Sequence, residues 1–451
     1  MDTNTISDNR YAIFLFSFLL LLGSHFLDYH LYIFIILALF LVKWSSLNQS
    51  KNIILVAFFV LSMYVTWTFL DKRLVSDFTL ALEVFSHGIF IFLMYLLGLS
   101  IKIKHSGSTL VSDRNIFYAL FLFVISYSFF VLWSYITITQ DTSLSGVGMY
   151  VCFPNPYQRA HVNGGRLIST ILTYYLTLMT FILPFILFYF TKLKRKGFYG
   201  IELLLLAVLA IFILYITALM GRRTVFALFA LVFVLLFLLQ FVRVKIDIKK
   251  MLFYSLVVIA LLYSVYAFIL EPKNPAKFEG FILTSDLMIP LMGAPEPSLL
   301  EKSMDFPIVK KLMAVGLHDK RFGWWSTAFD VILTYPYGGG NGVYIAPGIR
   351  LAHNTWIDIG KDFGIIPFVL FFIVTLLHLY YLVKIFFSNY VENLLKYQLL
   401  MIAIGVFAIM MIEPVFTSDK TFFAYIFFYF GVVCNVYLQL KNKQEISLEK
   451  A

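Results

Sequence analysis

Charged residues are scarce in this chain of 451 residues. Asp, Glu, Lys and Arg make up 13% of it, whereas 61% of its residues are hydrophobic. Soluble domains are about a quarter charged and about half apolar. The shortage of charge therefore excludes an ordinary soluble domain and predicts an integral membrane protein. The net charge of +10 could indicate a nucleic-acid partner, but the placement of the cations indicates membrane orientation instead. We expect no nucleic acid among the partners.

Cysteine is scarcer still, with only two residues in the chain. Cys152 and Cys434 lie far apart in the sequence. They offer neither a disulfide framework nor the spacing of a metal site. No repeat of fixed period and no low-complexity linker divides the chain. We therefore expect one membrane domain without a structural metal.

Long apolar runs are abundant, and twelve of them approach the roughly 20 residues that a membrane span needs. The twelve predicted spans are 11–27, 29–43, 52–70, 79–101, 116–138, 167–190, 201–220, 224–242, 251–270, 363–387, 399–416 and 421–440. The first run lacks a small-residue cleavage site, so it is expected to be retained as a span.

Lysine and arginine predict the orientation of these spans. With the N-terminus in the cytoplasm, the inner loops are densely basic: "KWSSLNQSK", "KIKHSGSTLVSDR", "TKLKRKG", "RVKIDIKK" and the tail "KNKQEISLEK". The outer connections carry fewer cations, which is the usual bias. Both termini are therefore expected in the cytoplasm. Residues 139–166 and 271–362 are expected outside it.

The predicted fold class is an all-α integral membrane protein with about twelve transmembrane helices. A large extracytoplasmic loop with short helices separates spans 9 and 10. The expected parts are residues 1–270 with spans 1 to 9, the loop 271–362, and residues 363–451 with spans 10 to 12 and a cytoplasmic tail.

The large outer loop contains two recognisable pieces. "WWSTAFDVIL" places Trp325, Phe329 and Ile332 at helical spacing. An amphipathic helix with its tryptophans at the headgroup level explains this pattern. The glycine-rich turn "TYPYGGGNGVYIAPGIR" follows. Such a turn can direct backbone N–H groups at an anion, although it matches no phosphate-loop pattern.

The segment "AHNTWIDIGKDFG" predicts the start of a further helix. Asn354 is the expected N-cap, with Asp358 in the first turn. His353 precedes the first free N–H groups, and that end of a helix favours anions. The alternative for His353 is a histidine satisfied by its interfacial surroundings.

Several further charges lie where a membrane makes them costly. Arg222 and Arg223 occupy a short turn at the outer face, where they form an anion site or extend to headgroup phosphates. Arginine suits phosphate because its planar fork donates paired hydrogen bonds. Arg321 and Arg350 could join that site. Glu413, near the outer end of the eleventh span, could simply pair with one of these arginines.

A second outer segment carries Arg159, His161 and Arg166 near aromatic residues. Aromatic rings often stack on sugars, so these residues could form part of an acceptor groove. A plain solvated loop explains them equally well.

Taken together, these motifs resemble the O-antigen ligase and polymerase superfamily. The arginine turn that opens a span, the outer loop with "R...W" and "P..GGG", and "HNTWIDIGKDFGIIPF" carry the resemblance, mostly between residues 210 and 385. The resemblance implies a GT-C-like membrane glycosyltransferase of lipopolysaccharide assembly in the bacterial inner membrane, with its active site facing the periplasm. It also implies a donor glycan on undecaprenyl diphosphate and independence of metals and cofactors.

By that resemblance the functional positions are Arg223 (or Arg222), Arg321 and His353. The family commonly has a small hydroxyl residue before its arginine, where this chain has Arg222. The arginines would stabilise the departing diphosphate, as developing charge requires. The outer loops lack a DxD-type aspartate pair that could hold a metal for this purpose. His353 would remove the proton of the acceptor hydroxyl or bind phosphate. Arg222, Arg350 and Asn354 are expected to help bind the diphosphate.

Two activities fit this outline. A polymerase extends a lipid-linked repeat unit, whereas a ligase moves the chain to the lipid A core. The abundance of Phe (50) and Tyr (28) favours the polymerase. A chain-length regulator is then a further candidate partner besides the surrounding lipids. A lipid-glycan transporter or flippase is the alternative of another class, although its polar groups would be expected at the bilayer midplane.

Overall fold

The computed structural model describes part of the chain. The described residues are 39, 42, 44, 51–70, 78–107, 109–111, 116, 120, 321–339, 343–345, 351–418 and 420–449. All of them belong to one compact unit formed by residues 1–130, 298–302 and 319–451.

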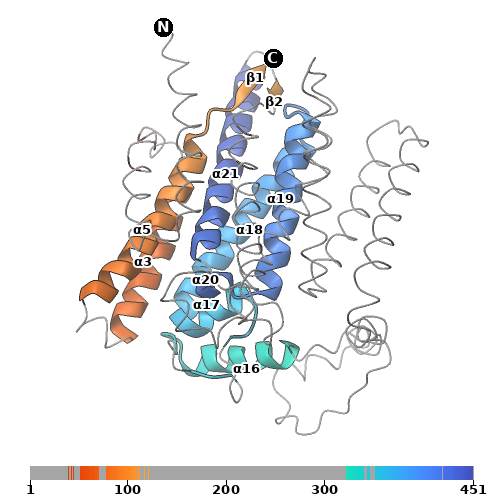
Figure 1. Cartoon of the computed structure of the whole chain (residues 1–451). Helices are drawn as coiled ribbons and strands as arrows, with labels where there is room; N and C mark the ends of the chain where they lie inside the picture. The colour runs from red at the N-terminus through yellow and green to blue at the C-terminus, as the bar shows by residue number, and fades with distance from the viewer. Residues whose placement is uncertain are drawn as a thin grey trace, which may run out of the picture. The chain divides into compact units, whose positions relative to one another are not determined.

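Ten elements make up the described part, in an arrangement that Figure 1 shows. They are α3 (Asn52–Leu70), α5 (Phe78–Ser100), β1 (Lys104–Ser106), β2 (Thr109–Val111), α16 (Arg321–Thr334), α17 (Thr355–Phe363), α18 (Ile365–Phe387), α19 (Asn393–Ile412), α20 (Val415–Ser418) and α21 (Lys420–Glu449). The long helices run side by side. The short helices α16, α17 and α20 gather at one end, which we call the α17 end. The two strands lie at the other, the hairpin end.

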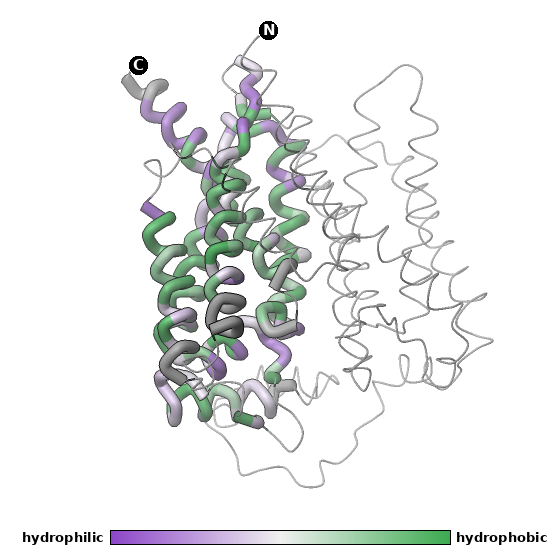
Figure 2. The backbone as a smooth tube through the Cα atoms, turned by 60° about the vertical axis from the view of Figure 1, so that its left-hand side comes forward, coloured by the Kyte–Doolittle hydropathy of each residue, from purple (hydrophilic) through white to green (hydrophobic). Residues whose placement is uncertain are grey.

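Three helices of the described part are long and apolar enough to cross a membrane: Ile365–Phe387, Asn393–Met411 and Phe422–Glu445. A helix of 23 residues such as α18 is roughly 35 Å long, which matches the hydrocarbon core of a bilayer. Figure 2 shows apolar residues along the length of the helices and polar residues towards their ends. The described part is thus helical and membrane-capable, as the composition predicts.

Five predicted spans coincide with or overlap helices of the described part, although the predicted span 399–416 also crosses the break at Glu413. The predicted span 52–70 coincides with α3, and 79–101 differs from α5 by one residue at each end. The predicted spans 363–387, 399–416 and 421–440 overlap α18, α19 and α21. The other seven runs lie wholly or mostly outside the described residues, so the count of twelve stays a prediction.

α18 presents a continuous apolar face that the described part of the chain leaves uncovered. Its exposed large side chains are Ile365, Ile366, Val369, Phe372, Ile373, Leu376, Leu379, Tyr380, Val383 and Phe387. The opposite face packs on α3 and α21. There Phe371 stacks on Phe59, with ring centroids 5.2 Å apart. A helix that is apolar on both its packed and its exposed faces is typical of a membrane span.

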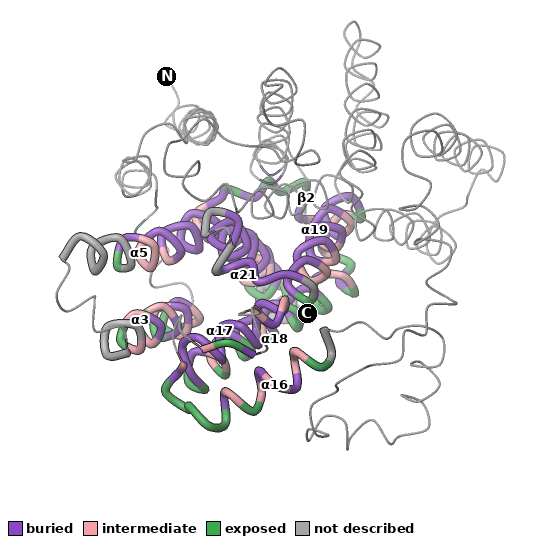
Figure 3. Tube along the Cα trace, turned by 60° about the horizontal axis from the view of Figure 1, so that its bottom comes forward, coloured by how far each residue is buried: buried purple, intermediate pink, exposed green. Residues whose placement is uncertain are grey.

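The closest helix pair is α5 with α21, which lie next to each other in Figure 3. Two glycines allow this approach. A Cβ atom on Gly98 would lie 2.2 Å from the carbonyl oxygen of Phe428, and one on Gly431 would lie 2.2 Å from that of Tyr95. Small residues at membrane helix interfaces let the backbones approach closely. Asn435 adds a hydrogen bond from its Nδ2 to the Ile101 carbonyl oxygen at 2.6 Å.

A polar group lies inside the bundle at His378 of α18. Its ring stacks on Phe430 with centroids 4.5 Å apart, and its Nδ1 lies 2.6 Å from the Val374 carbonyl oxygen. The Tyr95 hydroxyl lies 3.4 Å from Nε2. These contacts satisfy the buried imidazole and connect α18 to α5 and α21.

The hairpin end is closed by a small sheet. β1 and β2 pair antiparallel, and Leu110 of β2 bridges to Val391 in the α18–α19 connection. The Leu110 N–H donates to the Tyr390 carbonyl at 2.8 Å, and the Glu392 N–H donates to the Leu110 carbonyl at 2.8 Å. The connection between α5 and the following segment is thereby tied to the α18–α19 turn.

At the α17 end, the tryptophan helix predicted from the sequence is α16. It packs on α17 around a small apolar cluster formed by Ala328, Ile332, Ile345, Ala352 and Ile357. Trp325 and Phe329 lie against this cluster as well. The helical spacing of Trp325, Phe329 and Ile332 therefore serves protein packing.

The glycine-rich turn after α16 fastens that helix to the α17–α18 junction. Gly338 and Gly364 both have positive φ, 94° and 95°. The Gly339 N–H donates to the Lys361 carbonyl at 2.8 Å, and the Ile365 N–H donates to the Pro336 carbonyl at 2.9 Å. The Gly338 N–H donates to the Tyr335 carbonyl at 2.8 Å. These donors serve the fold, so the first half of the turn is not an anion loop.

Gly364→Ala is expected to loosen this junction. Its Cβ would lie 2.5 Å from the Pro336 carbonyl oxygen at a φ that L-residues rarely adopt. The cost should exceed the roughly 1–3 kcal/mol of backbone strain alone. The apparent melting temperature in detergent should fall.

Gly107→Ala is the matched control, because Gly107 also has positive φ but nothing lies within 4 Å of its Cβ position. It should cost only about 1–2 kcal/mol. Equal melting temperatures for the two variants would contradict the steric role of Gly364.

Candidate functional site

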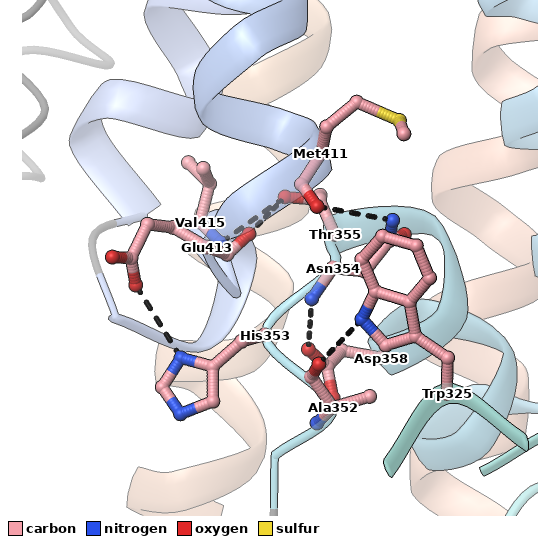
Figure 4. Close-up of polar contacts among 9 residues, drawn as sticks. All are labelled: Trp325, Ala352, His353, Asn354, Thr355, Asp358, Met411, Glu413 and Val415. Atoms are coloured by element: carbon pink, nitrogen blue, oxygen red, sulfur yellow. Dashed lines mark hydrogen bonds and ion pairs between the residues drawn. The ribbon is translucent and has the colours of Figure 1, made fainter. Parts of the chain in front are cut away.

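The candidate site lies where the segment before α17 meets a break between α19 and α20 (Figure 4). α19 ends at Ile412, and Glu413 takes an extended conformation with φ −140° and ψ 149°. Pro414 follows, and the residue before a proline is disfavoured in the helical region. At this break the side chain and the backbone carbonyl of Glu413 therefore face the segment that carries His353.

His353 has an unusual backbone conformation. Within the described part of the chain, it is the one non-glycine residue with positive φ, at 56°. Such a conformation costs roughly 1–3 kcal/mol and persists only where the surroundings enforce it. Residues held in this way cluster at functional sites.

The imidazole of His353 faces the carboxylate of Glu413. The distance from His353 Nδ1 to Glu413 Oε2 is 3.4 Å. The Glu413 side chain is 7% exposed, whereas that of His353 is 34% exposed. The second ring nitrogen, Nε2, points away from Glu413 (Figure 4). The shielded Glu413 carboxylate thus contacts Nδ1 of His353 and leaves Nε2 without a contact to Glu413.

Thr355 connects the start of α17 to the helix break. Its hydroxyl donates to the Glu413 carbonyl oxygen at 2.7 Å and accepts from the Val415 N–H at 3.2 Å. Thr355 is completely buried. The hydroxyl therefore fixes the backbone of Glu413 relative to α17, and with it the carboxylate opposite His353.

Asn354 is the N-cap of α17, as the sequence predicts. Its side-chain oxygen accepts from the Ile357 N–H at 3.2 Å, and its Nδ2 donates to the Met411 carbonyl at 3.3 Å. Asn354 is buried, with 4% exposed. Both ends of its amide are engaged by the protein, so its role here is to cap the helix and to contact α19. Its expected contact with the diphosphate stays a prediction.

Asp358, in the first turn of α17, reaches back to the segment before the helix. Its Oδ1 accepts from the Ala352 N–H at 2.7 Å, and its Oδ2 accepts from the Asn354 N–H at 3.2 Å. Trp325 of α16 donates from Nε1 to the Ala352 carbonyl at 2.8 Å. The backbone on either side of His353 is therefore held by hydrogen bonds (Figure 4).

α17 carries buried charge. All nine of its residues are buried, and Lys361 pairs with Asp362. The pKa of Asp358 is raised to about 7. Burial is the main cause and nearby Asp362 adds to it, whereas the N–H groups of Ala352 and Asn354 and the charge of Lys361 act in the opposite direction. Buried carboxylates with hydrogen bonds and raised pKa are typical of functional sites as well as of structural networks.

Trp324 lies beside His353. The two ring centroids are 5.6 Å apart, with an angle of 36° between the planes. Trp324 is half-buried. An aromatic surface therefore adjoins the exposed part of the imidazole.

The structure brings three of the sequence-predicted site residues together: His353, Asn354 and Glu413. Arg321 is the first residue of α16, but its side chain lies outside the description. The remaining candidates lie outside the described residues altogether: Arg159, His161, Arg166, Arg222, Arg223 and Arg350. The sequence suggested an arginine as the partner of Glu413, whereas the contact the structure shows is with His353.

Sequence reasoning missed three residues at this site. Thr355 carries no sequence signal beyond a hydroxyl next to an N-cap. Asp358 was noted for its place in the first turn, not for its hydrogen bonds to the preceding segment. Trp324 was expected at the membrane interface, and only the packing of α16 on α17 places it next to His353.

Among the described residues, no group of three or more His, Cys, Asp or Glu side chains could hold a metal ion. His353 and Glu413 are themselves groups that can transfer protons and form hydrogen bonds. Neither a protein-family model nor a curated protein sequence matches the chain. The family resemblance thus depends on the motif residues themselves.

Proposed function

We propose that this protein is a membrane glycosyltransferase that transfers a glycan from undecaprenyl diphosphate to a sugar hydroxyl. The observation that carries the proposal is the His353–Glu413 contact beside the start of α17. A base oriented by a carboxylate is the arrangement that activates a hydroxyl nucleophile. The resemblance of "HNTWIDIGKDFGIIPF" to the O-antigen ligase and polymerase superfamily supplies the substrate class.

In this mechanism His353 Nε2 accepts the proton of the acceptor hydroxyl. The acceptor oxygen forms a bond to the anomeric carbon, and the bond from that carbon to the diphosphate oxygen breaks. The diphosphate departs with the electron pair. Glu413 Oε2 beside Nδ1 favours the tautomer with a proton on Nδ1, which leaves Nε2 free to act as the base.

The departing diphosphate needs positive charge to stabilise it. We propose that Arg223 (or Arg222), Arg321 and Arg350 provide it, because guanidinium groups bind phosphate in a bidentate manner and stay charged. Arg159, His161 and Arg166 are proposed as an outer part of the acceptor groove. These assignments follow from the sequence motifs. In this proposal the α17 end faces the periplasm at the inner membrane, with both termini in the cytoplasm and about twelve spans in all.

Of the two activities, we propose the polymerase, which extends a lipid-linked repeat unit. The test uses purified protein in lipid nanodiscs with undecaprenyl-diphosphate-linked repeat units and, separately, with lipid A core as acceptor. Growth of the lipid-linked glycan supports a polymerase. Transfer to lipid A core alone would show a ligase. No new glycosidic bond with either acceptor would overturn the proposal, and translocation of the lipid-linked glycan in vesicles would then favour a transporter.

Trp324 is proposed to hold the acceptor sugar against His353, because the apolar face of a pyranose ring packs on aromatic rings. Trp324→Ala should raise the acceptor KM by up to about tenfold, the equivalent of about 1.4 kcal/mol. Trp324→Phe should retain most of the affinity. Initial rates over a range of acceptor concentrations measure both. An unchanged acceptor KM in Trp324→Ala would remove this residue from the acceptor site.

A further inference from the structure

The backbone around His353 is held by hydrogen bonds that take no direct part in the proposed proton transfer. Asp358 accepts one hydrogen bond from the residue before His353 and one from the residue after it. The two oxygens of one carboxylate therefore span the residue that holds the unusual φ of 56°.

We propose that Asp358 is the positioning residue of His353: its carboxylate clamps the flanking N–H groups of Ala352 and Asn354 and so directs the imidazole towards Glu413. This inference rests on the proposed function for its effect on catalysis. The clamp itself is a property of the structure and can be tested without an activity.

Burial supports this role. Asp358 is 2% exposed and Ala352 is fully buried, so water does not readily replace these hydrogen bonds. Hydrogen bonds to a charged group are about twice as strong as those between neutral groups. Two of them can offset the backbone strain at His353.

The partners of the clamp also reach other parts of the site. The Ala352 carbonyl accepts from Trp325 of α16, and the Asn354 side chain contacts α19 through Met411. Asp358 thus fixes a segment that α16, α17 and α19 all contact. A shift of about 1 Å in a catalytic group can reduce the rate about 10²-fold.

The charged groups that act on Asp358 in the described part of the chain are Asp362 and Lys361, one of each sign, both on α17. The pKa of Asp358 is raised to about 7, mainly by burial. The buried state therefore takes up a proton more readily than an exposed state would, so acidification through that value should not by itself open the clamp.

The first test measures amide hydrogen exchange in the unmodified protein in nanodiscs, resolved by mass spectrometry of peptides that cover 351–355. The Ala352 and Asn354 amides should be protected from exchange on both sides of pH 7. Free exchange of both amides at all pH values would overturn the clamp. Asp358→Asn keeps the shape but offers one acceptor oxygen instead of two, so it should release one of the amides.

The second test measures transfer kinetics. Asp358→Asn should lower kcat by about 10²-fold with little change in the donor KM. Asp358→Glu, which keeps both acceptor oxygens, should recover part of the rate.

Asp362→Asn is the control, since it removes from the same helix a buried carboxylate that pairs with Lys361. It should change the amount of folded protein more than the kcat of the folded fraction. A wild-type rate in Asp358→Asn would overturn the positioning role. Absence of transfer in the wild type, together with protected amides, would instead refute the proposed function and leave the clamp intact.

Discussion

The His353→Ala variant is expected to lose glycan transfer while its folded, membrane-inserted amount stays normal. His353 is the proposed base, and a positioned base contributes about 10²–10⁴-fold to the rate. Its side chain is 34% exposed, so its removal leaves no deeply buried cavity. Alanine also loses the contact with Glu413, whose side chain is 7% exposed, but Thr355 still holds the backbone of Glu413 in place.

The measurement is the initial rate of lipid-linked glycan growth by protein matched for folded amount. His105→Ala is the control, because His105 is exposed on β1 at the hairpin end. That variant should keep the full rate. Retained transfer in His353→Ala would remove the base assignment.

Glu413→Gln, alone and combined with His353→Ala in a double variant, tests whether Glu413 acts through His353. If Glu413 acts through His353, the double variant should be no slower than His353→Ala alone, because residues that act as a unit are strongly non-additive. Losses that simply multiply would show that Glu413 acts separately, as expected if it paired with an arginine of the diphosphate site instead.

Gly98→Ala is expected to have the largest effect on folding. A single methyl group there would lie 2.2 Å from the Phe428 carbonyl oxygen and 2.8 Å from the Val432 nitrogen. These are backbone atoms of α21, which cannot rotate away as a side chain can. α5 and α21 would have to separate along their length, and overpacking of this kind costs 1–3 kcal/mol or more.

The apparent melting temperature and the yield of monodisperse protein in detergent measure this effect. Gly431→Ala should behave in the same way, because its Cβ would lie 2.2 Å from the Tyr95 carbonyl oxygen. Gly323→Ala in α16 is the matched control. Nothing lies within 4 Å of its Cβ position, so alanine should stabilise the helix by about 0.5–1 kcal/mol. Equal stability of Gly98→Ala and the wild type would contradict the close backbone contact.

The packing of α21 against the α17 end explains why the site can be sensitive to changes far from His353. Phe416 follows the helix break and packs on Phe363 of α17 and on Phe423 of α21, with ring centroids 5.2 and 5.1 Å apart. A displacement of α21 would therefore reach the segment that holds Glu413. Reduced activity in Gly98→Ala would then follow from packing and not from lost chemistry.

Much of the local structure could be predicted from the sequence. The run 52–70 coincides with α3, because a long stretch of apolar residues encodes a membrane helix without reference to its neighbours. Asn354 could be identified as an N-cap because the capping bond joins residues three apart. His353 could be singled out because it stands next to that cap. Each of these features depends on a few consecutive residues.

The partners of those residues could not be predicted in the same way. Glu413 is 60 residues from His353, and its charge alone suggested pairing with an arginine. The glycines after α16 suggested an anion loop, but the Gly338 N–H bonds to the Tyr335 carbonyl and the Gly339 N–H bonds to the Lys361 carbonyl. The sequence shows that a residue type is unusual in its place, but it does not show which distant group satisfies it.

The sequence by itself determined that the chain is membrane-capable, where five of its helices lie, and that a histidine and an asparagine precede a helix outside the spans. Only the tertiary structure decided that Glu413 faces His353, that Trp324 lies beside it, and that Asp358 turns back on the segment before α17. The physical reason is the range of the interactions. Helix formation and capping act within a few residues, whereas these contacts exist only because α16, α17 and the α19–α20 break pack together.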